Sequence, residues 1–150
     1  MPPTKHCWAA AGSTAPFMPP PDRRFWRNAG ASAGARPAKP GSPRGYALAA
    51  RHVIHTGGPI WQGGGEGEEA LLGGCYRGSL TLARDRDLKA IAFPAISTGV
   101  YRFPPARAAE IAVATVAQFL ADDRIPEKVI FCCFGEASAD AHRAALSGIG

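Results

Sequence analysis

The segment Ser97-Thr98-Gly99 holds the residue types in this chain that are best suited to chemistry. It follows residues 89–93, an apolar run with the length and composition of a strand. It precedes Pro104-Pro105, where a helix can begin because the first turn does not use proline's missing N–H. A loop between a strand and a helix groups outward-pointing backbone N–H groups, which suit an anion the size of a phosphate.

Two residues, one in this segment and one just after it, bear on how the loop is interpreted. Gly99 lets the backbone approach a ligand closely, and Tyr101 places an aromatic ring beside it. From these features alone, a ligand-binding loop and an ordinary strand-to-helix turn are about equally supported.

The length and composition limit the class of protein. A chain of 150 residues suits one domain with one core. No apolar run reaches the ~18 residues that a membrane helix needs, and we see no secretory signal, so we expect no membrane partner and a cytoplasmic location. The spacing of the four cysteines and four histidines is not that of a metal site. We therefore expect free thiols, no metal and no cofactor.

Charge and proline divide the chain into two parts. Residues 1–51 carry eight Lys or Arg against one acid, whereas residues 52–150 carry nine against eleven. The first 43 residues also hold nine of the fourteen prolines and show no helical or strand period. We therefore predict an irregular or disordered segment over residues 1–43 and a folded domain over residues 44–150.

The folded part alternates strand-like and helix-like segments. This alternation predicts an α/β layer fold with a largely parallel sheet, in which ligands gather at the carboxyl ends of the strands. The run 128–134 is nearly all apolar, which predicts burial on both faces. Leu71 is expected on or near the buried side of its helix. The expected strands are residues 51–55, 90–93 and 128–134, and the expected helices are residues 66–85, residues 104–121 and a last helix capped by Ser138 and ended by Gly148.

Several motifs also resemble those of a known family, the macrodomains. The resemblance is carried by residues 45–59, by Trp61 and by residues 75–80, which read C-Y-R-G-S-L. Residues 92–101, A-F-P-A-I-S-T-G-V-Y, are similar almost letter for letter to the diphosphate loop of one subgroup, the bacterial O-acetyl-ADP-ribose deacetylases and mono-ADP-ribosyl hydrolases. The resemblance covers residues 44–150. It implies a three-layer macrodomain-like fold with a largely parallel central sheet, truncated at the N-terminus.

The same resemblance implies which residues bind ligand. It assigns the diphosphate and distal ribose of ADP-ribose to one loop, made of Ser97, Thr98, Gly99, Val100 and Tyr101. Phe134, at the end of the last expected strand, would lie near the adenine and could stack on it; plain core packing of Phe134 is the alternative. The implied partners are ADP-ribose or O-acetyl-ADP-ribose, or a mono-ADP-ribosylated protein.

The N-terminal segment departs from the family. Macrodomains begin with a strand bearing an adenine-contacting Asp, an N-A-A-N motif and a glycine-rich loop, whose Asn and Asp orient and activate the attacking water. Residues 1–43 contain none of these motifs, so no catalytic residue is assigned. One hypothesis explains this segment as an out-of-frame translation of the same gene. Codons for N-A-A-N-K-A-L-L-G-G-G-G-I-D-G-A-I-H, shifted by one base, can encode M-P-P-T-K-H-C-W-A-A-A-G-S-T-A-P-F-M, which is residues 1–18.

Three functions follow as alternatives. In intact members the family activity is hydrolysis of ester-linked groups on ADP-ribose, and we expect it to be impaired in this chain. The second alternative is a non-catalytic module that binds ADP-ribose. The third is nucleic-acid binding by the basic arm, which we regard as a solvated charge run instead; its residues are Arg23, Arg24, Phe25, Trp26 and Arg27.

Overall fold

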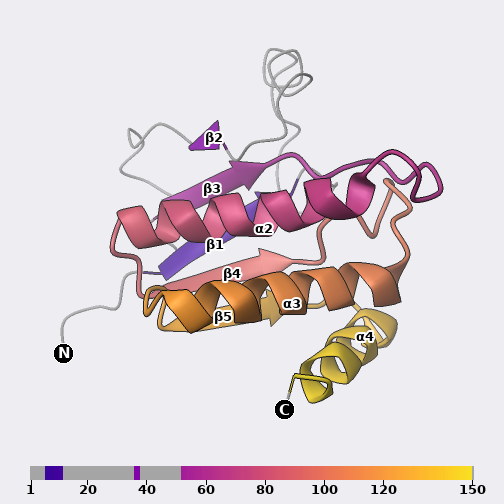
Figure 1. Ribbon diagram of the computed structural model, residues 1–150. Coiled ribbons are helices and arrows are strands. Elements are labelled where there is room, and N and C mark those ends of the chain that lie inside the picture. Colours follow the sequence, from indigo (N-terminus) through magenta and orange to yellow (C-terminus); the bar gives the residue numbers. More distant parts are fainter. Residues whose placement is uncertain (1–5, 12–35, 38–51, 150) are drawn as a thin grey trace.

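The computed structural model describes residues 6–11, 36–37 and 52–149 (Figure 1). Its strands are β1 (His6–Ala11), β2 (Arg36–Pro37), β3 (His52–Thr56), β4 (Ala90–Pro94) and β5 (Lys128–Cys132). Its helices are α2 (Glu68–Asp85), α3 (Pro105–Asp122) and α4 (Glu136–Ser147). From β3 to β5, each element begins and ends within about two residues of its predicted position, and only the start of α4 differs by more.

The strands form one sheet in the order β2-β3-β1-β4-β5. β1 pairs in parallel with β3 and β4, and β4 pairs in parallel with β5. Only β2 runs antiparallel, against β3. The predicted α/β class with a largely parallel sheet is confirmed. The carboxyl ends of β3, β4 and β5 therefore lie along one edge of the sheet.

The position of β1 differs from the sequence-based expectation. Residues 6–11, H-C-W-A-A-A, lie within the segment predicted to be irregular, yet they form a strand between β3 and β4. An alanine-rich run has weak strand propensity, so its pairing on both sides reflects tertiary context. Residues 1–5, 12–35 and 38–51 lie outside the described residues, and with them lies the basic arm.

Helices α2 and α3 lie side by side over one face of the sheet (Figure 1). Leu72, Tyr76 and Leu80 of α2 are almost fully buried, as is Phe93 of β4. The Tyr76 and Phe93 rings lie 5.0 Å apart. Leu71 is 40% exposed, so its predicted burial is wrong, because it falls outside the helical stripe that Leu72 begins.

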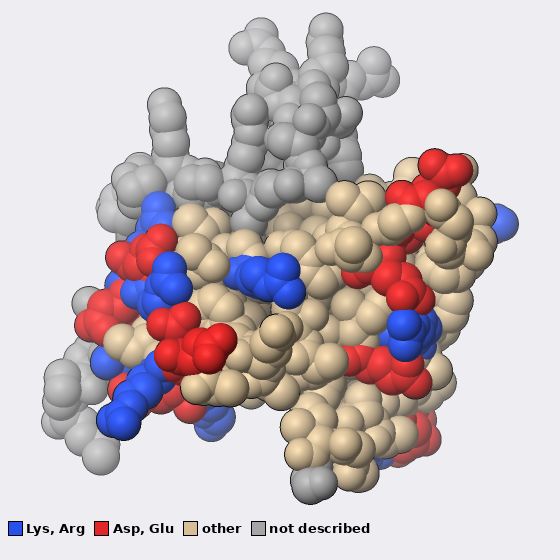
Figure 2. Space-filling view, viewed as in Figure 1, with Lys and Arg blue, Asp and Glu red and all other residues tan. Residues whose placement is uncertain are grey.

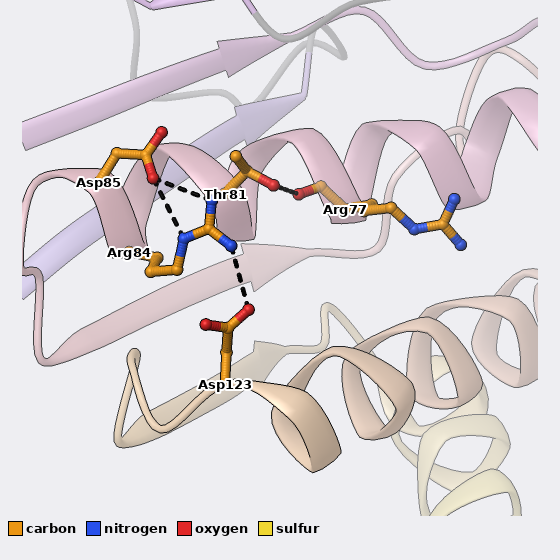
Figure 3. Close-up of polar contacts among 5 residues, drawn as sticks. All are labelled: Arg77, Thr81, Arg84, Asp85 and Asp123. Atoms are coloured by element: carbon orange, nitrogen blue, oxygen red, sulfur yellow. Dashed lines mark hydrogen bonds and ion pairs between the residues drawn. The ribbon is translucent and has the colours of Figure 1, made fainter.

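Exposed ion pairs join α2 and α3 at both ends. At the C-terminal ends, the Arg84 guanidinium contacts Asp85 and reaches Asp123 at 3.1 Å (Figure 3). At the N-terminal ends, Arg107 of α3 contacts Glu69 of α2 at 2.6 Å. Each pair is solvent-exposed and adds little to stability.

Charges on this face are interleaved in sign. Figure 2 shows acidic and basic side chains together at both ends of the helical layer, with a mostly uncharged surface between them. No helix among the described residues is long and apolar enough to cross a membrane.

Two predictions for the C-terminal part are wrong. β5 was predicted to be buried on both faces, but it is the last strand of the sheet and is half-exposed. A parallel strand at the edge lacks the second neighbour that would bury it. Ser138 was predicted to cap the last helix, but α4 begins at Glu136 with Gly135 as its N-cap residue. Gly148 ends that helix as predicted.

Candidate binding site at the carboxyl edge of the sheet

The loop between β4 and α3, residues 95–104, is closed by its own backbone. The N–H of Phe103 donates to the carbonyl of Ser97 at 3.0 Å, and the N–H of Arg102 donates to the carbonyl of Gly99 at 2.9 Å. Ser97 and Arg102 have φ values of 65° and 56°, in the left-handed region that residues other than glycine rarely adopt. Such backbone strain is common in ligand-binding loops.

Three successive N–H groups in this loop are available to a ligand. Within the part of the chain that the structure describes, the N–H groups of Gly99, Val100 and Tyr101 donate no hydrogen bond. Gly99 and Val100 are exposed to solvent. Helix α3 begins a few residues later, and its N-terminus adds positive electrostatic potential. This arrangement can bind an anion.

The loop between β3 and α2 packs against this first loop. The N–H of Trp61 donates to the carbonyl of Tyr101 at 2.8 Å. The rings of Trp61 and Phe103 lie 4.6 Å apart. The hydrogen bond from Trp61 fixes the backbone carbonyl of Tyr101, and the ring contact with Phe103 holds Trp61 in place.

Gly58 makes a close approach that no other residue allows. A Cβ atom at this position would lie 2.2 Å from Ser97 Oγ and 2.7 Å from Ile96 Cγ2. Side chains cannot approach this closely, so any other residue at position 58 displaces Ser97. Gly58 therefore leaves the space that the side chains of Ser97 and Ile96 occupy.

Glu68, at the start of α2, organises the glycine-rich loop. Its carboxylate accepts hydrogen bonds from the N–H groups of Gln62 at 2.9 Å, Gly64 at 3.1 Å and Glu66 at 2.7 Å. Backbone N–H groups, first that of Glu68 itself and then that of Gln62, lower the pKa of Glu68 from 4.5 to about 2. The side chain is only 2% exposed. Glu68 thus stays ionised and holds the loop beside Trp61.

Two buried hydroxyl groups lie at the same edge of the sheet. Ser97 Oγ follows β4, and Thr56 Oγ1 ends β3; neither makes a hydrogen bond to the residues that the structure describes. Strand β1 lies between β3 and β4, and its Ala11 is in register with Thr56. Unpaired buried hydroxyls are rare, and they mark this edge as polar.

The cysteine next to this edge has a structural role. Cys75 Sγ donates to the carbonyl of Gly57 at 3.2 Å, and burial raises the pKa of the Cys75 thiol. Cys75, Cys132 and Cys133 form no disulfide with one another. Among the described residues, no three His, Cys, Asp or Glu side chains are grouped in a way that could hold a metal ion.

Phe134 lies two residues beyond the end of β5 and is 95% exposed. The alternative of core packing is therefore wrong. Because β5 is next to β4, Phe134 lies at the same edge of the sheet as the loop of residues 97–101. An exposed aromatic ring can stack on a flat ligand.

The sequence alone identified the loop of residues 97–101 and the ring of Phe134, but not the residues that support the loop. The structure adds Gly58, Trp61 and Glu68, and it adds the hydroxyl of Thr56. Glu68 had a readable signal, since a carboxylate directly after a glycine-rich loop and at a helix start is placed to accept loop N–H groups. The contact between Gly58 and Ser97 had no such signal, because the two residues are far apart in sequence.

Comparison with known proteins supports one family. The family model described as Macro domain matches residues 37–112. A macro domain-containing protein of Mesorhizobium japonicum is 54% identical over 106 residues, which are 71% of this chain and 60% of that protein. An O-acetyl-ADP-ribose deacetylase of Escherichia fergusonii is 54% identical over 89 residues, which are 59% of this chain and 50% of that protein. The chain thus spans about half to three fifths of the length of these relatives.

Solved structures agree. The Oceanobacillus iheyensis macrodomain with ADP superposes with a TM-score of 0.70 at 35% identity, covering 78% of this chain and 58% of that one. The Trypanosoma brucei macrodomain in complex with ADP-ribose superposes with a TM-score of 0.67 at 27% identity, covering 98% of this chain and 64% of that one. The predicted macrodomain fold is confirmed.

Proposed function

The chain belongs to the macro domain family, and we propose that it binds ADP-ribose through the loop of residues 97–101. The observation that carries this proposal is the run of N–H groups at Gly99, Val100 and Tyr101, which make no hydrogen bond to described residues in a loop where Gly99 and Val100 are exposed. Amides fixed in this way bind a diphosphate without reorganising. Ser97 and Thr98 complete the loop, and Thr98 Oγ1 donates to the carbonyl of Ala95 at 3.0 Å.

Phe134 is proposed to stack on the adenine. Its ring is almost fully exposed at the carboxyl end of β5, next to β4, from whose end the diphosphate loop begins. Tyr101 is half-buried and held by Trp61, so it offers a fixed wall to the distal ribose. Both roles need an aromatic ring beside a polar loop.

We propose binding with little or no turnover. Relatives named O-acetyl-ADP-ribose deacetylase share 52–54% sequence identity with this chain over about 90 residues. Ester hydrolysis is therefore the second candidate function. Hydrolysis needs a water that is held and activated. The family's Asn and Asp for that task have no counterpart in residues 1–43 as written.

Isothermal titration of the full chain with ADP-ribose tests the proposal. Val100→Pro removes one of the free N–H groups, and we expect it to weaken binding about tenfold or more, as loss of a charge-assisted hydrogen bond does. Val100→Ala keeps the N–H and is the matched control, because Val100 is 65% exposed. Absence of binding by the unaltered chain, or equal affinity of both variants, would refute the proposal.

The adenine contact is tested separately. Phe134→Ala is expected to weaken ADP-ribose binding by about 1–3 kcal/mol, the usual worth of stacking on a base. Affinity for inorganic pyrophosphate should stay unchanged, because that ligand has no base. An equal loss for both ligands would place Phe134 outside the adenine contact.

A further inference from the structure

The glycine-rich connection between β3 and α2 lies against the loop that is proposed to bind ADP-ribose. Figure 1 shows both connections at the end of the sheet where β3 and β4 finish. Trp61 joins them: its N–H donates to the Tyr101 carbonyl at 2.8 Å, and its ring lies 4.6 Å from that of Phe103. A displacement of Trp61 would therefore displace the backbone of Tyr101.

The Trp61 ring leaves no room for a side chain at Gly64. A Cβ atom at position 64 would lie 2.9 Å from Cη2 and 3.4 Å from Cζ2 of that ring. Gly64 has a φ of 89°, in the left-handed region that suits glycine. Since the backbone of Gly64 packs directly on the ring, the position of Trp61 depends on where this backbone lies.

The carboxylate of Glu68 fixes that part of the backbone. It accepts a hydrogen bond from the N–H of Gly64 at 3.1 Å and another from that of Gln62 at 2.9 Å. Glu68 is buried, and hydrogen bonds to a charged acceptor are roughly twice as strong as those between neutral groups. The chain is thus held directly after Trp61 and again where it packs on the ring.

We propose that Glu68 is a positioning residue for the Tyr101 ring, acting through Gly64 and Trp61, and that it raises the affinity for the distal ribose of ADP-ribose. This inference rests on the proposed function, in which Tyr101 faces that ribose. A ring that is fixed before the ligand arrives is not ordered at the expense of binding energy, so affinity depends on the contacts that hold it.

Affinity for the diphosphate should depend less on Glu68. The N–H of Arg102 donates to the Gly99 carbonyl at 2.9 Å, which closes the turn that carries the N–H groups of Gly99 and Val100. That hydrogen bond lies within the turn and does not involve Trp61. ADP has the diphosphate but no distal ribose, so a comparison of ADP with ADP-ribose separates the two contributions.

Titration calorimetry of the full chain with ADP-ribose and with ADP tests the inference. Gly64→Ala places a methyl group against the Trp61 ring. We expect affinity for ADP-ribose to fall about threefold to tenfold, the usual worth of one hydrogen bond, and affinity for ADP to fall less. Gly63→Ala is the matched control: Gly63 has a similar φ of 109°, but no atom of the described residues lies within 4 Å of a Cβ there.

A second variant removes the carboxylate and leaves the space beside the ring unchanged. Glu68→Gln should show the same larger loss for ADP-ribose than for ADP, at a temperature where circular dichroism shows the chain folded. Glu69→Gln removes an equal charge from the next residue, which is 41% exposed, and should bind both ligands as the unaltered chain does. Combined, Glu68→Gln and Gly64→Ala should lose less affinity than the sum of their separate losses, because both act through Trp61.

The outcomes distinguish this inference from the proposed function. If the unaltered chain binds ADP-ribose but Gly64→Ala binds it as Gly63→Ala does, only the positioning role is overturned. Equal losses for ADP and ADP-ribose in Glu68→Gln would likewise overturn the assignment to the distal ribose. Absence of binding by the unaltered chain would overturn the proposed function and this inference with it.

Discussion

The contact between Gly58 and Ser97 leaves no room for a Cβ atom at position 58, next to the proposed binding loop. The space that a Cβ atom at position 58 would need is filled by Ser97 Oγ and by Ile96. Ser97 is itself held in a left-handed conformation, so the loop has little freedom to move away. The two residues join the β3 and β4 ends of the site into one unit.

We therefore expect Gly58→Ala to destabilise the protein by about 1–3 kcal/mol, as overpacking of a tight contact does, and to weaken ADP-ribose binding with it. Gly57→Ala is the matched control, because no atom lies within 4 Å of a Cβ at that position. Urea unfolding and titration calorimetry measure the two effects. If Gly58→Ala and Gly57→Ala had the same stability and the same affinity for ADP-ribose, the contact between Gly58 and Ser97 would not hold the loop in place.

Glu68 makes stability depend on pH in a defined window. Its pKa is lowered from 4.5 to about 2, so the folded chain binds this proton less readily than the unfolded chain does. The contribution of Glu68 is therefore fully present above about pH 4.5 and is lost as the pH falls toward 2.

Replacing Glu68 by Gln should remove that part of the pH dependence and lower stability at neutral pH. One amide oxygen cannot accept all the hydrogen bonds that the carboxylate accepts from Gln62, Gly64 and Glu66. Urea unfolding between pH 2 and pH 7 measures this change. Glu66→Gln is the control, since Glu66 contributes its backbone N–H and not its side chain. An unchanged pH profile in Glu68→Gln would contradict the assignment.

Helix α2 was predicted well as an element but less well in its orientation. Its acidic start, its length and its apolar stripe follow from spacing in the sequence. Spacing alone does not show which of the adjacent residues Leu71 and Leu72 faces the sheet, because both fit an apolar stripe of ordinary width. The structure buries Leu72 completely and leaves Leu71 40% exposed.

Leu72→Ala should accordingly destabilise the chain by about 2–5 kcal/mol, since it opens a cavity between α2 and its neighbours. Leu71→Ala should change the free energy of unfolding by less than about 0.5 kcal/mol. Thermal or urea unfolding of the two variants side by side checks this. Similar losses in both would mean that α2 is rotated about its axis relative to the sheet described above.

The sequence predicted the location of β5 correctly but its burial wrongly. Its run of apolar residues is typical of a strand buried on both faces, and that pattern gave its location correctly. Its half-exposed state follows from its place at the end of the sheet order. Strand order is set by long-range pairing, which a local pattern does not encode. The same reason explains why residues 6–11 were not recognised as a strand.

At the scale of the whole molecule, the central question is whether a chain that keeps the proposed binding loop of residues 97–101 can also catalyse. We expect this chain to bind ADP-ribose but to hydrolyse O-acetyl-ADP-ribose weakly or not at all. A gene whose reading frame is restored by one base upstream of the codon for Arg44 should encode the family's N-A-A-N and glycine-loop motifs. We expect its product to bind ADP-ribose and to hydrolyse O-acetyl-ADP-ribose. A deacetylation assay of both chains measures the difference.

Equal turnover by the two chains would show that the N-terminal segment carries no catalytic group. The nucleotide sequence upstream of the codon for Arg44 is the independent check. Should the neighbouring frame encode none of the family motifs, the frameshift hypothesis would be wrong, while the proposed binding by residues 97–101 would stand on its own contacts.

Local chemistry along the chain was enough to predict the alternation of strands and helices, the anion-binding character of residues 97–101 and the family resemblance. Each of these depends on residues close together in sequence, where spacing and residue type act directly. The fold alone decided that Phe134 is exposed, that Gly58 contacts Ser97 and that β5 is the last strand of the described sheet. These features join segments that are distant in sequence, and only the packing of the whole sheet determines which of them meet.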